Sequence, residues 1–170
     1  MSQPVLIIFL TIGSLLSGSA SANAQEYFPD RITGIWEGYL QLWSNGNKKD
    51  SVRVILTVAP KSDKTWQWKM EYLSEKVPMV KDYVMRISDK EKQILITDEG
   101  GGVELEDYVF GNKMFSLFET QEFWLTSTQE LKDNKLIFEV TAGKKSKKLE
   151  KDVTNYSVTS MQRAVLNKKH

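Results

Sequence analysis

Residues 65–72 read Thr-Trp-Gln-Trp-Lys-Met-Glu-Tyr, and this stretch alternates strictly between polar and large apolar side chains. A period of two places the apolar set on one face of an extended strand and the polar set on the other. On a helix both sets would be scattered around the surface. The apolar set consists of Trp66, Trp68, Met70 and Tyr72. The stretch therefore predicts a half-buried β-strand with an aromatic inner face.

The same alternation recurs along the chain, at 52–58, 83–87 and 136–140. Turn residues such as Asn45-Gly46 lie between these stretches, since Asn and Gly tolerate positive φ angles. We expect ten strands, at 33–43, 51–59, 65–73, 80–88, 93–98, 103–110, 113–119, 122–128, 135–142 and 153–165. Short polar connections favour antiparallel neighbours, and a long meander tends to close because closure removes both unpaired edges. The sequence thus predicts an all-β fold, a single antiparallel meander β-barrel of about 8–10 strands.

Two stretches allow another interpretation. Residues 120–131 could form a short helix, because Thr120 and Glu122 resemble a helix start. Pro78 excludes a helix within 71–85 but also interrupts a strand there. Neither alternative changes the all-β prediction.

The segment 1–24 has the pattern of a secretory signal peptide. Residues 5–16 form an apolar run that suits the core of such a peptide and is shorter than the ~20 residues that cross a bilayer. Residues 22–24, Ala-Asn-Ala, match a small-x-small cleavage site. Residues 1–4 carry no Lys or Arg, so a buried strand of the mature chain stays open as an alternative. We expect one domain, 25–170, exported to the periplasm or the extracellular space.

The composition narrows the classes of partner. The chain has 23 basic and 22 acidic residues, which gives no sign of a nucleic-acid or membrane-surface partner. No second long apolar run follows the leader, so we expect no transmembrane helix after cleavage. The chain has no cysteine, hence no disulfide, and packing with backbone pairing must hold the fold. We expect a monomer.

Residues 33–38, Thr-Gly-Ile-Trp-Glu-Gly, resemble the Gly-x-Trp start of the lipocalins and their calycin relatives. The resemblance implies that Trp36, preceded by Gly34, closes one end of the barrel. It also implies that a basic residue of the last strand packs across the Trp ring in a cation–π contact. Arg163 is the matching position that we expect here.

The chain departs from individual families of that superfamily. Only residues 44–50 separate the first two expected strands, so the two helices that fatty-acid-binding proteins insert there are missing. Residues 144–151 are a poor candidate for the late helix of many lipocalins, and the lipocalin disulfide is absent. The resemblance is therefore to the broad superfamily, and it implies no ligand class.

The sequence lacks the residues that several kinds of catalytic and metal sites require. The only histidine is His170 at the chain end, so Ser-His-Asp or Cys-His catalysis, ordinary zinc sites and axial haem ligation are not expected. We expect no cofactor and no metal. Four acids lie around Gly100-Gly101-Gly102, namely Glu99, Glu104, Glu106 and Asp107. A pair of them could serve glycoside hydrolysis or bind calcium, but a solvated hairpin is the simpler interpretation. The basic run 144–148 is interpreted as a charged hairpin tip.

The aromatic face gives the main functional hypothesis. If the apolar side chains of 65–72 face the interior, they line a broad wall that Tyr83, Met85 and Phe123 could extend. Arg86 or Tyr72 could supply a polar group for a ligand. We expect a secreted or periplasmic protein that binds a small apolar or amphipathic molecule. Two alternatives stay open: a non-catalytic structural or interaction protein of the cell envelope with a solid barrel, and a carboxylate-based hydrolase or isomerase.

Overall fold

The structure is a computed structural model that describes residues 26–89, 93–144, 149–150, 153–154 and 156–169. The expected signal peptide, residue His170 and most of the basic run 144–148 lie outside the described residues. A short helix, α1 (Phe28–Arg31), precedes the first strand. Ten strands form the barrel: β1 (Gly34–Ser44), β2 (Asn47–Ser62), β3 (Thr65–Leu73), β4 (Met79–Asp89), β5 (Ile94–Gly100), β6 (Val103–Phe110), β7 (Lys113–Glu119), β8 (Phe123–Lys132), β9 (Lys135–Lys144) and β12 (Ser160–Lys168). Two further strands, β10 (Leu149–Glu150) and β11 (Val153–Thr154), pair with each other.

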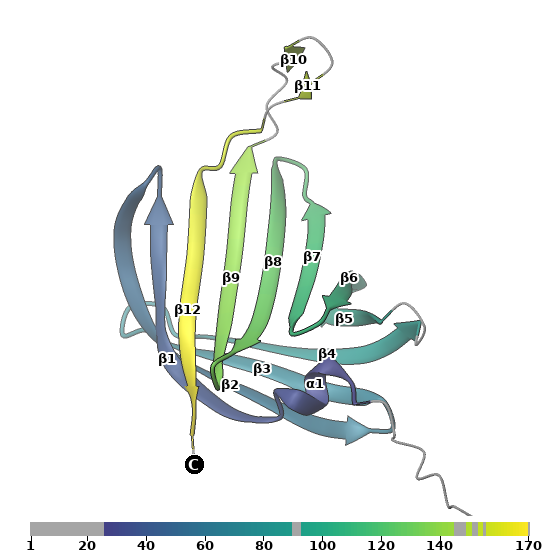
Figure 1. Ribbon diagram of the computed structural model, residues 1–170. Coiled ribbons are helices and arrows are strands. Elements are labelled where there is room, and N and C mark those ends of the chain that lie inside the picture. The colour runs from purple at the N-terminus through teal and green to yellow at the C-terminus, as the bar shows by residue number, and fades with distance from the viewer. Residues whose placement is uncertain (1–25, 90–92, 145–148, 151–152, 155, 170) are drawn as a thin grey trace, which may run out of the picture.

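The ten long strands form a closed barrel in the order β1-β12-β9-β8-β7-β6-β5-β4-β3-β2 (Figure 1). Each strand pairs antiparallel with its neighbour in sequence, and β12 closes the ring by pairing with β1 over Trp36–Lys168 to Ser44–Ser160. The excursion to β10 and β11 lies outside the barrel wall, beyond the end of β9. The predicted all-β antiparallel meander barrel is confirmed.

One detail of the strand prediction needs correction, and one alternative interpretation is excluded. The last strand expected at 153–165 is divided: β11 belongs to the separate pair, and the barrel strand begins only at Ser160. The possible helix within 120–131 is instead strand β8, because its partners β7 and β9 provide hydrogen bonds on both edges. Pro78 lies in the connection between β3 and β4, so its missing N–H costs no ladder hydrogen bond.

The interior follows the period-two alternation that the sequence shows. Trp66, Trp68, Met70 and Tyr72 of β3 are all buried, at 8% exposure or less. They lie beside the inward residues of β2, where Val54 pairs with Tyr72, Leu56 with Met70 and Val58 with Trp68. Facing strands contribute the remaining core side chains, among them Leu40, Met85, Leu136, Phe138 and Leu166.

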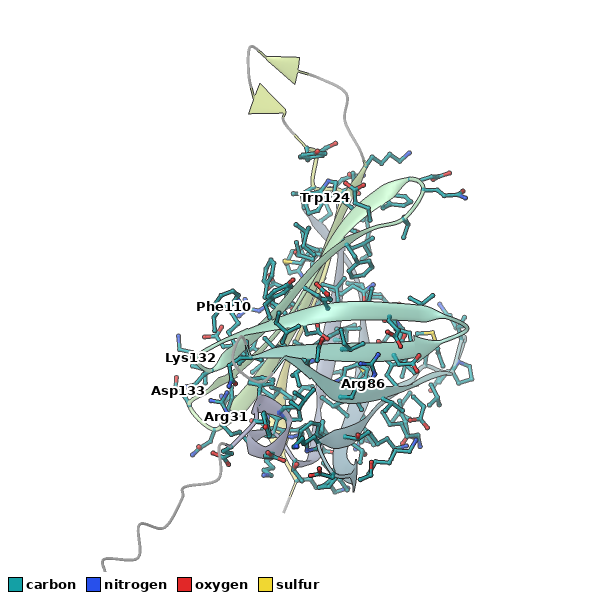
Figure 2. The ribbon with its side chains drawn as sticks, turned by 90° about the vertical axis from the view of Figure 1, so that its right-hand side faces the viewer. Arg31, Arg86, Phe110, Trp124, Lys132 and Asp133 are labelled. Atoms are coloured by element: carbon teal, nitrogen blue, oxygen red, sulfur yellow. The ribbon has the colours of Figure 1, made fainter. Side chains whose placement is uncertain are left out.

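Helix α1 closes one end of the barrel. Phe28 and Ile32 are 1% and 0% exposed, and they pack with Trp36 in the same core. The Trp36 indole Nε1 donates to the Ile32 carbonyl at 2.7 Å, which satisfies the buried indole N–H. Arg31 ties the helix to the turn between β6 and β7 by donating to the side chain of Asn112 and the carbonyl of Gly111, both at 2.7 Å. Figure 2 shows Arg31 at this closed end and Trp124 near the opposite, open end.

The basic residue over Trp36 is Lys168, not Arg163. Lys168 pairs directly with Trp36 in the β1–β12 register, and its Nζ lies 5.4 Å from the ring centroid. Side chains alternate between the two faces of a strand. Arg163 lies five positions before Lys168, so its side chain points to the opposite, outer face. There it approaches Glu139 at 3.6 Å (Nε to Oε2). The resemblance gave the right kind of contact and the wrong residue, because the expected strand ended before Lys168.

Candidate functional site

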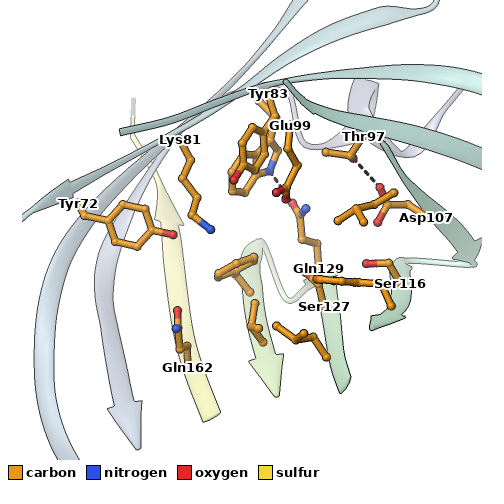
Figure 3. Close-up of a pocket in the computed structure, with 16 residues that line it drawn as sticks. Tyr72, Lys81, Tyr83, Thr97, Glu99, Asp107, Ser116, Ser127, Gln129 and Gln162 are labelled. Carbon is orange, nitrogen blue, oxygen red and sulfur yellow. Dashed lines mark hydrogen bonds between the residues drawn. The ribbon is translucent and has the colours of Figure 1, made fainter. Parts of the chain in front are cut away.

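A cavity of about 280 Å³ lies in the barrel at the end opposite α1. Its walls come from β3 to β9 and from β12, so nearly every strand contributes (Figure 3). The lining residues are Trp68, Tyr72, Lys81, Tyr83, Thr97, Glu99, Leu105, Asp107, Ser116, Phe118, Leu125, Ser127, Gln129, Phe138, Val140 and Gln162. They occupy the inward positions of their strands, as the pairing of Ser116 with Ser127 and of Gln162 with Val140 shows. The barrel is therefore packed at its closed end and hollow at its open end.

An aromatic cluster forms one wall of the cavity. Trp68 stacks on Tyr83, with ring centroids 5.6 Å apart and ring planes 12° from parallel. Phe138 meets the same indole from β9, at 6.0 Å between centroids and a tilt of 47°. Trp68 Nε1 donates to Gln129 Oε1 at 3.0 Å, so the buried indole is satisfied and the Gln129 amide has a fixed orientation. The wall offers a flat apolar surface beside an oriented polar group.

Asp107 is a buried acid in the cavity wall, with only 5% of the residue exposed. Thr97 Oγ1 donates to its Oδ2 at 2.5 Å. Burial raises the pKa of Asp107 to about 6. The hydrogen bond from Thr97 and the nearby Ser116 hydroxyl work against this increase, and the charge of Glu99 adds to it. Ser116 Oγ is buried too, and within the described part of the chain it makes no hydrogen bond of good geometry. Asp107 and Ser116 can therefore bind a polar ligand atom, and the Asp107 carboxyl changes its charge near pH 6.

Two tyrosine hydroxyls in the cavity are held in the neutral form. Burial raises the pKa of Tyr72 to about 12, and the charge of Glu99 adds to the increase. The pKa of Tyr83 is also raised to about 12, first by burial and then by Glu99, Tyr72 and a hydrogen bond to Glu99. Both groups thus stay protonated at physiological pH and can donate a hydrogen bond.

Lys81 brings a positive charge into the cavity from β4. It pairs with Met70 of β3 and lies two residues from Tyr83, which puts it on the inner face. Its Nζ lies 5.8 Å from the Tyr83 ring centroid. Among the described residues, no carboxylate forms an ion pair with Lys81.

The structure divides the seven residues expected to bind a ligand. Trp68, Tyr72 and Tyr83 line the cavity, whereas Trp66, Met70, Arg86 and Phe123 do not. Trp66 lies at the closed end, where its Nε1 donates to Asp30 at 2.8 Å, and Met70 is fully buried in the core. Phe123 begins β8 and pairs with Lys144, beyond the cavity wall.

Arg86 lies on the outer face of the barrel, where its Nη2 donates to Glu104 at 2.8 Å. Although it was expected to supply a polar group for a ligand, it lies outside the cavity, because it alternates with the inward residues Tyr83 and Met85. That alternation is visible in the sequence.

Other cavity residues were missed by sequence reasoning. Asp107 was grouped with the acids of a solvated hairpin. Of the three acids of β6, Glu104 and Glu106 are exposed, whereas Asp107 alternates with them and faces inward. Lys81 and Gln129 lie in strands whose inward residues are both polar and apolar. No alternating apolar pattern therefore marked them as inward residues. Within the described residues, no group of three or more acids lies close enough to hold a metal ion. In that same part of the chain, no helix is long and apolar enough to cross a bilayer.

Comparisons with known proteins agree with the fold. No protein-family model and no curated protein sequence matches the chain. Among solved structures, the barrel is similar to an S-type phycobiliprotein lyase, CPES, from Guillardia theta, with a TM-score of 0.63 and 9% sequence identity. The match covers 84% of this chain and 91% of the lyase chain. The likeness extends over most of both chains, so this chain shares the closed antiparallel barrel fold with the lyase.

Proposed function

We propose that this protein binds a small amphipathic organic molecule inside the open end of its barrel. The cavity carries the proposal, because its lining combines an aromatic wall with hydrogen-bonding groups that the fold leaves available. Its volume of about 280 Å³ lies near the lower limit of ligand pockets, which are about 300–1,000 Å³. The similarity to a phycobiliprotein lyase supports the barrel fold on which the proposal rests. A solid barrel is the less favoured alternative, since side chains fill only the closed end.

The lining also indicates what the ligand should look like. An apolar ring or short chain can pack on Trp68 and Phe138, and apolar burial contributes about 25 cal/mol per Å² before the costs of binding. Polar atoms of the ligand can reach Gln129, Ser116 and Asp107. Because these groups are buried, leaving one of them unpaired costs binding free energy, so the site selects a ligand that pairs with them.

We also propose export from the cytoplasm, which rests on the leader pattern at 1–24. The N-terminal sequence of mature protein from the native host tests this proposal.

The test is to fill the cavity. Ser127 of β8 faces the interior, and a Trp in its place would occupy the space that a ligand needs. We expect Ser127→Trp to weaken binding of the uncharged fluorescent probe N-phenyl-1-naphthylamine by about tenfold or more, equal to about 1.4 kcal/mol. Titrations of probe fluorescence on the purified protein measure this directly.

The matched control is Thr128→Trp, which adds the same ring to the outer face of the same strand. It should bind the probe as the unmodified protein does, and circular dichroism should show that both variants are folded. If Ser127→Trp fails to fold, Gln162→Trp with the outward Arg163→Trp repeats the comparison on β12. Equal probe affinity in the inward and outward variants would contradict binding in the cavity.

A further inference from the structure

We infer that the ligand is an organic carboxylate whose charged end lies against Lys81, an inference that rests on the proposed binding function. The first observation is that Lys81 differs from three other cations of strands β2 to β4. Arg53, Lys69 and Arg86 lie on the outer face and pair with Glu37, Glu71 and Glu104 at 3.1, 3.0 and 2.8 Å. Lys81 points inward, and within the described part of the chain it has no such partner. A cation in a cavity without its counterion is a natural position for an anionic ligand group.

Two neutral hydrogen-bond donors face the same region of the cavity as this cation. Figure 3 shows the Tyr72 hydroxyl, the Lys81 ammonium and the Gln162 amide facing one region of the cavity, on β3, β4 and β12. Because Tyr72 stays protonated, its hydroxyl can donate to an anion beside the ammonium. A carboxylate has two oxygens and about four lone-pair sites, so it can accept from all three groups at once.

Acidic residues lie elsewhere in the cavity, so its positive and negative groups are on different sides. Asp107, Thr97 and Ser116 gather on the other side of Figure 3, and Glu99 lies near Tyr83 between the two regions. These carboxylates repel an anion and attract a hydrogen-bond donor. A ligand with its carboxylate at Lys81 and its apolar body along the aromatic wall satisfies both regions.

The single cation at this region of the cavity favours a monoanion over a dianion. Among the described residues that line the cavity, Lys81 is the single cation, and Glu99 and Asp107 are the two acids. A phosphate monoester carries about two negative charges near neutral pH and is usually held by several cationic or backbone donors, which this lining lacks. A singly charged carboxylate is the anion that one lysine and two neutral donors suit.

A matched pair of probes tests the inference: 1-naphthylacetate and its uncharged amide, 1-naphthylacetamide. They share the ring and differ in the charged end. By isothermal titration calorimetry at pH 7.5, the unmodified protein should prefer the carboxylate. Lys81→Met should weaken carboxylate binding by about 10- to 100-fold, the range for a hydrogen bond to a charged group. It should leave amide binding within about twofold, because methionine keeps the apolar stem of the lysine.

The control is Lys69→Met, which removes the same charge from the outer face of the adjacent strand and should change neither affinity. Equal binding of acid and amide by the unmodified protein, or an equal loss of both in Lys81→Met, would overturn the carboxylate assignment while leaving ligand binding intact. Binding of neither probe would count against the proposed function and this inference together.

Discussion

Replacing Trp36 with alanine is expected to lower the free energy of unfolding by about 3–5 kcal/mol, the usual range for a fully buried tryptophan. The side chain is 2% exposed and packs with Phe28 and Ile32 at the closed end of the barrel. Alanine would leave a cavity there and would leave the Ile32 carbonyl without the hydrogen bond that it accepts at 2.7 Å. Phe28 of helix α1 would lose the Trp36 ring with which it packs in the core.

Urea denaturation followed by far-ultraviolet circular dichroism measures the effect. Tyr39→Ala is the matched control, because Tyr39 is an aromatic residue of the same strand that faces outward and is 62% exposed. That variant should change the unfolding free energy by less than about 0.5 kcal/mol, as surface substitutions usually do. A loss below about 1 kcal/mol for Trp36→Ala would mean that the ring does not close the barrel.

The barrel itself could be predicted from the sequence because strand alternation is a local property. The inward stripe of β3 and the Val-rich stripe of β2 both appear as every second residue, and their pairing follows from the short turn between them. Closure followed from a general argument, since ten strands in a meander leave two edges that are best paired with each other. The structure confirms that pairing between β1 and β12.

Features that depend on tertiary contacts could not be predicted from local sequence patterns. Helix α1 has four residues, too few to be stable alone, and exists because Phe28 and Ile32 are buried beneath the strands. The pairing of Lys168 with Trp36 required the exact register of the last strand, and a one-residue slip would have turned Lys168 outward. The sequence resemblance suggested such a contact without fixing its position.

The cavity was foreseen only in part. Its aromatic wall was expected from Trp68, Tyr72 and Tyr83, because large apolar residues on one face of a strand must be buried somewhere. Whether they leave a hollow depends on how side chains from eight strands fill the interior together, which no single stretch reveals. The polar groups were harder to identify, since an inward Lys81 or Asp107 looks like any surface charge until the strand register is known.

Asp107→Asn is expected to stabilise the protein at neutral pH, by an amount that disappears in acid. Burial raises the pKa of Asp107 from 3.8 to about 6 in the folded protein. The folded state therefore holds this proton more tightly than the unfolded chain does. As pH rises from about 4 to about 6, the folded protein has to release a proton that the unfolded chain has already lost, so stability falls across this window and stays low above it.

The size of the effect follows from the shift of about two pKa units, at about 1.4 kcal/mol for each. Asparagine is neutral at every pH, and its carbonyl can still accept the hydrogen bond from Thr97. The variant should match the unmodified protein near pH 4 and exceed its unfolding free energy by about 2–3 kcal/mol at pH 7.5. Urea denaturation at several pH values between these limits gives the difference directly.

Glu106→Gln provides the control, because Glu106 is an exposed acid on the outer face of the same strand. It should change the unfolding free energy by less than about 0.5 kcal/mol at each pH. A difference between Asp107→Asn and the unmodified protein that stays constant from pH 4 to pH 7.5 would show that Asp107 reaches solvent. The carboxyl would then not be the buried, partly desolvated group that makes the open end of the barrel selective, because selectivity there depends on polar groups that water cannot satisfy.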